Sequence, residues 1–99
     1  MKNPTPFEAG FLAGQTETIP PGAFKMSNRS REYTLGFIVG HSESQSIQMA
    51  SPDVAVWTAA ELARRYNASP DELLPHMGFD REQTERFYEA YDDEGMNQN

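Results

Sequence analysis

Few residues of this chain could carry out covalent or metal chemistry, because its 99 residues include two histidines and no cysteine. Without cysteine there can be no thiolate nucleophile, no disulfide and no Cys-containing zinc or iron–sulfur site. His41 and His76 each lack a second histidine or a carboxylate cluster at the spacing of metal ligands. His41-Ser42-Glu43 contains the residue types of a hydrolase triad, but three adjacent residues at a helix end cannot all converge on one substrate.

The spacing of the glycines does not indicate a phosphate-binding loop either. Gly10 and Gly14 fall inside a predicted helix, whereas dinucleotide and phosphate loops join a strand to a helix. We therefore expect no catalytic residue, no metal and no cofactor. The function that this composition favours is binding to a macromolecular partner.

The distribution of charge is the strongest remaining signal. Residues 1–70 hold six basic and six acidic residues, whereas residues 71–99 hold nine acidic residues and two arginines, which account for the whole net charge of −7. Because like charges repel, direct binding of this segment to DNA is not expected. The expected partner is a protein or ribonucleoprotein complex with a basic groove, and the oligomeric state stays open. The candidate binding residues are Glu82, Glu85, Glu89, Asp92, Asp93, Asp71 and Glu72.

A helix predicted from Arg81 to about Asp93 places most of these acids in one stripe. Asp80 precedes it as the N-cap, and Gln83 stands at the capping-box position. The acids recur at spacings of three and four, while aromatic residues form a second face. At about 1.5 Å rise per residue the acids lie about 5–6 Å apart, which is comparable with phosphates on a nucleic-acid strand. Such a face can occupy a groove built for nucleic acid, and it is equally typical of a solvated helix.

A basic cluster precedes the second predicted helix. It consists of Lys25, Arg29 and Arg31, with Tyr33 nearby. These residues form a secondary candidate contact, because lysine and arginine side chains bind phosphate groups. The alternative is that they are surface charges that pair with the acidic segment.

Capping signals predict the first two helices. Thr5, Pro6 and Glu8 form a capping box with proline at the first helical position, so a helix should run from there to about Gly14. A second helix should start near residue 28 or 30 and continue to His41. Both contain the pattern Gly-Phe-apolar-apolar-Gly-polar-hydroxyl-Glu, at residues 10–17 and 36–43, with an offset of 26. Glycines four residues apart leave a groove on one helix face, so we expect the two helices to cross there.

Further caps predict a C-terminal helical bundle in the same domain. Its expected parts are a linker at 44–53, a helix from Ser51-Pro52 or Thr58 to Tyr66, a short helix from Pro70 to Pro75 or Gly78, the acidic helix, and a disordered tail at 94–99. The predicted fold class is therefore all-α, with about five short helices. An N-terminal hairpin spans 5–43 and C-terminal helices span 54–93.

The stretch from 58 to 74 has the rhythm of a helix-turn-helix. A recognition helix needs donors at its N-terminal end to reach base edges in the major groove. Here that end is Pro70-Asp71-Glu72, which presents two carboxylates. A plain helical hairpin is therefore the main interpretation, and a DNA-binding regulator is an alternative.

The motifs within residues 5–43 resemble a known family. Residues 10–14 read like Gly-aromatic-x-Ala-Gly and residues 33–37 like Trp-x-x-Gly-Trp, with Pro21 and Arg29-Ser30 between them. This pattern is similar to that of the ribosome modulation factor family, which are short two-helix proteins of hibernating bacterial ribosomes. The resemblance implies a two-helix N-terminal unit and, as an alternative function, ribosome binding. That family is strongly basic, whereas this region is neutral.

In size, acidity and lack of catalytic residues, the whole chain is similar to small phage-encoded inhibitors, in particular anti-CRISPR proteins directed at type I surveillance complexes. That resemblance implies an inhibitor from a phage or mobile element whose acids engage the basic surfaces that hold guide or target nucleic acid, so that target DNA is excluded. The N-terminus opens no hydrophobic signal region, and no apolar run is long enough to span a bilayer. We therefore expect the cytoplasm of a bacterial host and no membrane contact.

Overall fold

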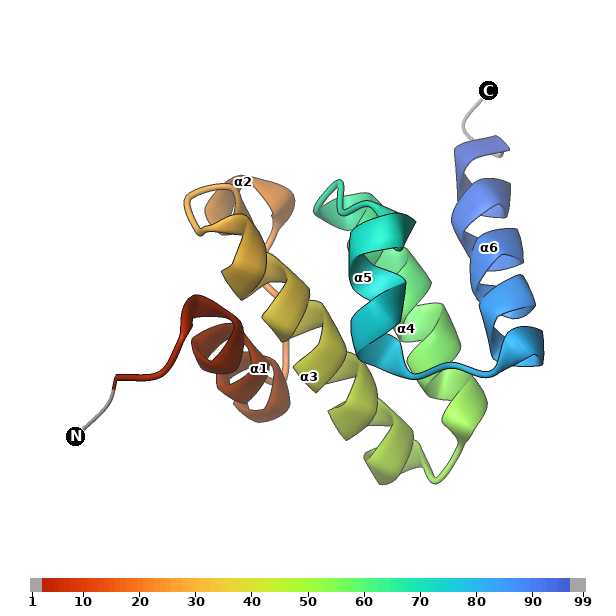
Figure 1. Ribbon diagram of the computed structural model, residues 1–99, viewed down its shortest axis with the longest axis horizontal. Helices are drawn as coiled ribbons and strands as arrows, with labels where there is room; N and C mark the ends of the chain where they lie inside the picture. The colour runs from red at the N-terminus through yellow and green to blue at the C-terminus, as the bar shows by residue number, and fades with distance from the viewer. Residues whose placement is uncertain (1–2, 97–99) are drawn as a thin grey trace.

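The computed structural model describes residues 3–96, with side chains to residue 92, and every regular element in that range is a helix (Figure 1). The helices are α1 (Pro6–Thr16), α2 (Ala23–Met26), α3 (Arg31–Met49), α4 (Pro52–Arg65), α5 (Pro70–Met77) and α6 (Arg81–Met96). The predicted all-α class is confirmed, and the one-turn helix α2 is an addition to the elements expected. The Cα radius of gyration of 13.0 Å matches the value of about 13 Å for a folded chain of this length.

The helices α1 and α3 cross at their glycines, as the repeat predicts. A Cβ atom built on Gly10 would collide with the carbonyl oxygen of Tyr33, and one built on Gly36 would collide with the carbonyl oxygen of Phe7. Both clashes are with backbone atoms, which no change of rotamer can relieve. The two backbones therefore lie as close as glycine allows, in the arrangement in which Cα–H groups face carbonyl oxygens.

The two helices run in the same direction, so the expected hairpin is corrected. Gly10 lies against Tyr33, and one turn further along both helices Gly14 lies against Phe37 and His41. Contacts that advance together along both helices describe a parallel pair. Residues 17–30, which contain α2, are therefore a crossover that returns the chain to the start of α3, and not the short turn of a hairpin.

The linker expected at 44–53 is wrong, because α3 continues as a helix to Met49. Residues 42–49 contain no proline or glycine, so nothing in them ends a helix, although they are mostly polar. The first residue that prevents continuation is Pro52, which disfavours helical backbone at Ser51. Ser51 accordingly has extended backbone angles, and Ala50 closes α3 in the left-handed region at φ 54°.

The later helices begin at the predicted caps. Ser69 caps α5, and a reciprocal capping box joins Asp80 and Gln83 at the start of α6, with hydrogen bonds of 2.8 and 3.0 Å. Pro75 lies inside α5 without ending it, and Gly78 ends it with φ 68°. The expected disordered tail at 94–99 is wrong for residues 94–96, which belong to α6, and residues 97–99 lie outside the described part.

The long helix α3 is the centre of the fold. It packs against α1 on one side and against α4 and α5 on the other, and α6 packs on α4 (Figure 1). The helices α3, α4, α5 and α6 each contribute to the core. Their largest fully buried hydrophobic side chains are Phe37, Ile38, Leu62, Leu73 and Phe87. Within residues 3–96 no helix is long and apolar enough to span a membrane.

Candidate binding surfaces

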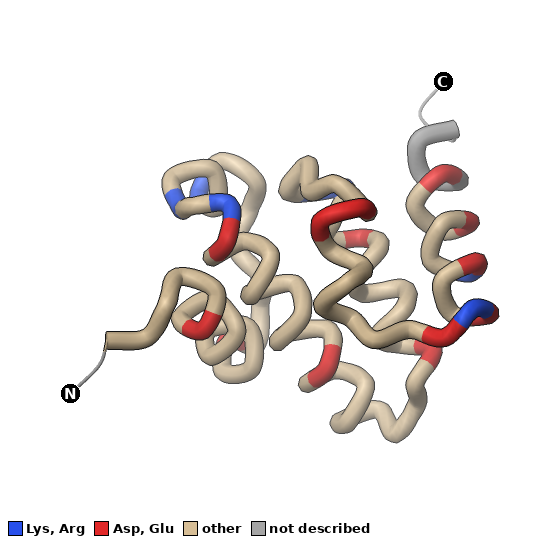
Figure 2. Tube along the Cα trace, in the orientation of Figure 1, with Lys and Arg blue, Asp and Glu red and all other residues tan. Residues whose placement is uncertain are grey.

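The acidic stripe lies on the outer face of α6. Phe87 is fully buried and anchors the inner face of this helix, while the Arg64 guanidinium donates a hydrogen bond of 3.0 Å to the Tyr91 carbonyl oxygen and lies 5.5 Å from the centre of the Tyr91 ring. The stripe itself faces away from the rest of the molecule (Figure 2). Its exposed members are Glu82, Glu85, Glu89 and Asp92.

Half of this stripe is paired with arginines. Arg86 bridges two acids, with ion pairs of 2.7 Å to Glu82 and 2.8 Å to Asp53 on α4. Arg81 lies 3.6 Å from Glu85. Within residues 3–92, by contrast, Glu89 and Asp92 form no ion pair and remain exposed. Within the described part of the stripe, the acids without an ion pair are therefore the two nearest the C-terminus.

The other candidate acids fall into two groups. Glu72 lies on α5 and forms an ion pair of 2.7 Å with Arg31 on α3, so the pair Asp71 and Glu72 belongs to the α3–α5 side of the molecule. The side chain of Asp93 lies outside the described residues. The seven predicted acids therefore do not form one surface.

The basic cluster is exposed and partly paired. The Arg29 guanidinium lies 4.6 Å from the centre of the Tyr33 ring, and Arg31 pairs with Glu72. Arg31 thus forms an ion pair with an acid of the C-terminal segment. This is the alternative to phosphate contact that the sequence left open for the basic cluster. Lys25 and Arg29 are exposed.

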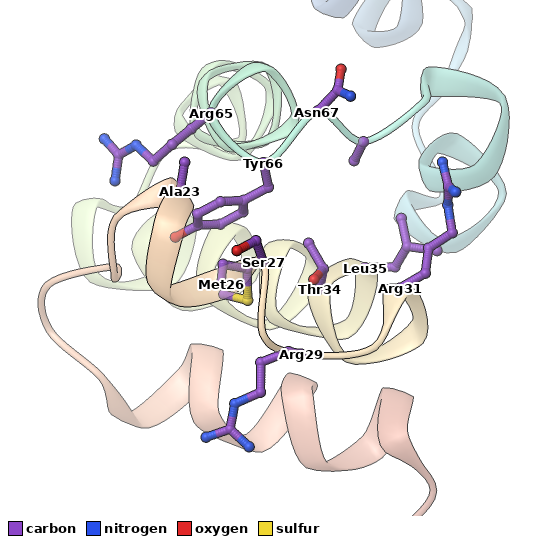
Figure 3. Close-up of a pocket in the computed structure, with 11 residues that line it drawn as sticks. Ala23, Met26, Ser27, Arg29, Arg31, Thr34, Leu35, Arg65, Tyr66 and Asn67 are labelled. Atoms are coloured by element: carbon purple, nitrogen blue, oxygen red, sulfur yellow. The ribbon is translucent and has the colours of Figure 1, made fainter.

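A hollow of about 420 Å³ lies beside this basic cluster (Figure 3). It is formed by α2, the first turns of α3 and the end of α4. The sequence did not predict that residues at the end of α4 and just after it line this hollow. These residues are Arg65, Tyr66, Asn67 and Ala68. These residues are more than thirty positions away from Arg29 and Arg31, and no local pattern links the two segments.

Tyr66 forms a wall of this hollow. Its hydroxyl group donates a hydrogen bond of 2.6 Å to the Pro21 carbonyl oxygen, which ties the crossover segment to the end of α4. Burial of the phenol disfavours its charged form and raises the pKa of Tyr66 above its ordinary value of 10.0.

His41, Ser42 and Glu43 have separate surroundings. The buried His41 ring donates from Nδ1 to the Gly14 carbonyl oxygen at 3.0 Å and stacks on Phe37 at 5.7 Å between ring centres. Ser42 is completely buried, whereas Glu43 is exposed. His41 therefore joins α3 to the end of α1, and the three side chains do not converge.

His76 also has a packing role, since its ring lies 4.6 Å from the ring of Phe7 between centres. Among the residues that the structure describes, no three His, Cys, Asp or Glu side chains are grouped so that they could hold a metal ion.

The fold and these surfaces define a small all-α protein with an acidic helix face and, apart from it, a hollow with a cationic rim. The chain belongs to the family described as "Protein of unknown function (DUF2623)", which its residues 1–96 match. No curated protein and no solved structure matches it.

Proposed function

We propose that the protein is a non-enzymatic inhibitor of the kind encoded by phages and mobile elements, an anti-CRISPR protein that blocks target DNA binding by a type I surveillance complex. The observation that supports this proposal is the pair Glu89 and Asp92, two exposed carboxylates one helical turn apart without an ion pair among the described residues. They lie on a helix whose opposite face is anchored in the core by Phe87.

A carboxylate that already pairs with arginine gains little from a second cation, whereas an unpaired one gains a charge-assisted hydrogen bond when lysine or arginine approaches. Glu89 and Asp92 therefore contribute more to binding a basic groove than Glu82, which already pairs with Arg86 at 2.7 Å. Complementary charge also raises the association rate and makes it sensitive to salt.

The test uses a purified type I surveillance complex and measures its binding to labelled target DNA by fluorescence anisotropy. Wild-type protein is expected to inhibit DNA binding, and the double variant Glu89→Lys, Asp92→Lys is expected to need at least about tenfold more protein for the same inhibition. The matched control is Glu17→Lys, Glu43→Lys, which changes the net charge equally at exposed positions outside α6, after the end of α1 and on α3. The control should inhibit like the wild type.

Two results contradict the proposal. Failure of the wild-type protein to inhibit would reject the anti-CRISPR function. Equal loss of inhibition in both double variants would show that only net charge matters and would reject a role for the α6 face. Circular dichroism of each variant checks that all of them are folded.

Ribosome binding is the second candidate. It is favoured by the finding that the glycines of the ribosome modulation factor motif form the α1–α3 crossing, beside which Arg29 lies exposed against Tyr33. Co-sedimentation of the protein with bacterial ribosomes, reduced by Arg29→Gln, would support it. A regulator that binds duplex DNA through α4 and α5 is the third alternative, and absence of binding to duplex DNA at low salt would reject it.

A further inference from the structure

The hollow beside α2 differs in charge from the rest of the molecule. Three of the eight basic residues of the chain line it, namely Arg29, Arg31 and Arg65, and no acidic residue whose side chain the structure describes does. In a protein with net charge −7 this lining is the more favourable place for an anion, which there competes with Glu72 and Glu61, the carboxylates that pair with Arg31 and Arg65. Its volume of about 420 Å³ lies within the range of about 300–1,000 Å³ of small-molecule sites.

The floor of the hollow is apolar and the wall is aromatic. The buried side chains of Met26, Leu35 and Ala68 line it. The ring of Tyr66 lies next to Met26, and Leu35 lies further along, beside Arg31 (Figure 3). The hydrogen bond from the Tyr66 hydroxyl to the Pro21 carbonyl oxygen holds this ring in place. A ligand that fits both floor and rim therefore has a flat apolar part and an anionic part.

The arginines lie at the rim and their head groups extend outward (Figure 3). Arg31 is held by Glu72 at 2.7 Å, with the two side chains 62% and 40% exposed, and Arg65 is held by Glu61 at 2.9 Å. Exposed pairs of this kind contribute little to stability, because water already solvates both charges. A phosphate group, which offers more acceptors than a carboxylate, can therefore replace Glu72 as the partner of Arg31.

We infer that this hollow binds a nucleoside phosphate, with the base against Tyr66 and the phosphate at Arg31. The ligand chemistry has two sources, a free mononucleotide or the phosphorylated end of a nucleic-acid strand. The site lies on α2, α3 and α4, so it is independent of the α6 face and of the inhibitor function proposed above.

The experiment measures binding by isothermal titration calorimetry with four probes: adenosine 5′-monophosphate, adenosine, inorganic phosphate, and an RNA tetranucleotide with a 5′-phosphate. Adenosine 5′-monophosphate is expected to bind more tightly than adenosine or phosphate alone. Arg31→Gln should weaken this binding about tenfold, because a charge-assisted contact is lost. Arg81→Gln is the matched control, since it removes the same charge from a side chain that is 95% exposed on α6.

A second variant tests the exchange of partners at Arg31. Glu72→Gln removes the competing carboxylate and should tighten nucleotide binding about two- to threefold. A residue with only a structural role would weaken binding or leave it unchanged when its partner is removed. The opposite effects of Arg31→Gln and Glu72→Gln are therefore the signature of the proposed site.

Each outcome decides the question. Binding of the mononucleotide supports a free nucleotide as the ligand, and binding of the phosphorylated RNA alone supports the end of a strand. Equal binding of adenosine and adenosine 5′-monophosphate would overturn the role of the arginines. Binding of none of the four probes, or equal weakening by Arg31→Gln and Arg81→Gln, would overturn the site altogether.

Discussion

Replacement of Gly36 by alanine tests the close α1–α3 crossing, because the crossing and helix propensity predict opposite changes in the free energy of unfolding. In an open helix, Gly→Ala stabilises by about 1 kcal/mol because alanine loses less backbone entropy on folding. At Gly36 the new Cβ atom would lie 2.9 Å from the Phe7 carbonyl carbon and 3.0 Å from the Phe11 backbone nitrogen, and it would lie closer still to the Phe7 carbonyl oxygen. The crossing therefore predicts destabilisation where helix propensity alone predicts a gain.

The magnitude follows from what has to move. Because the obstructing atoms are backbone, the helices must separate, and a gap of about 0.5–1 Å loses a quarter to a half of each dispersion contact across it. Overpacking of this kind costs about 1–3 kcal/mol, and the upper end applies when no side chain can yield. After subtraction of the propensity gain, we expect a net loss of about 2 kcal/mol, which lowers Tm by roughly 8–16 °C in a domain of this size.

Urea denaturation followed by circular dichroism measures this free energy of unfolding. Gly22→Ala is the control, because a Cβ built on Gly22 meets nothing within 4 Å, and it should change stability by less than about 0.5 kcal/mol. Gly10→Ala, at the equivalent position of the repeat, should match Gly36→Ala. The double variant should cost less than the two single losses combined, because helices already separated accept the second methyl group more easily. A stabilised Gly36→Ala protein would refute the close crossing.

Three further predictions concern single side chains. Burial raises the pKa of Tyr66 above 10.0. The stability that the neutral phenol contributes is therefore complete below pH 10.0 and is lost as pH rises through the raised pKa. Tyr66→Phe should therefore lose about 1 kcal/mol at neutral pH with the bond to Pro21, yet show a smaller decline in alkaline denaturation curves. Hydrogen bonds from Thr5, chiefly the one from its backbone N–H, lower the pKa of Glu8 below its ordinary 4.5, so the stability present above that pH is lost as pH falls through the lowered value. An NMR titration of Glu8 should show this shift, and Thr5→Val, which keeps the backbone N–H, should reduce the shift without abolishing it. Ser42→Ala should stabilise by about 1 kcal/mol in thermal denaturation, because its buried hydroxyl has no hydrogen-bond partner among the described residues.

Local signals in the sequence predicted the helix starts well, because a cap is decided by neighbouring residues. The side chains of Thr5, Ser30, Ser69 and Asp80 all accept hydrogen bonds from backbone N–H groups at the starts of α1, α3, α5 and α6. The end of α3 was harder to predict, because polar residues suggest a linker while their backbone propensities allow a helix. Only Pro52 carried a real stop signal.

The direction of α1 relative to α3 could not be predicted from the glycine repeat. Glycines at a spacing of four allow close approach in either direction, so the motif predicts a crossing without predicting its sense. What decides the direction is the path of residues 17–30, and this depends on contacts such as the hydrogen bond from Tyr66 to Pro21, across 45 positions of sequence.

The same distinction between local and distant partners explains how far the acidic surface could be predicted. A charge count treats Glu82 and Glu89 alike, although an arginine four residues after Glu82 already indicates a pair on a helix, and the structure has that pair at 2.7 Å. The second partner of Arg86 is Asp53, which is 33 positions away and outside the reach of any helical spacing rule. A search for binding residues in an acidic helix therefore improves when acids with an arginine or lysine at i+4 are set aside first. In α6 that rule removes Glu82, and its extension to an arginine at i−4 removes Glu85 through Arg81. Among the acids of α6 whose side chains are described, this leaves Glu89 and Asp92, which form no ion pair within residues 3–92 and can attract a cationic partner.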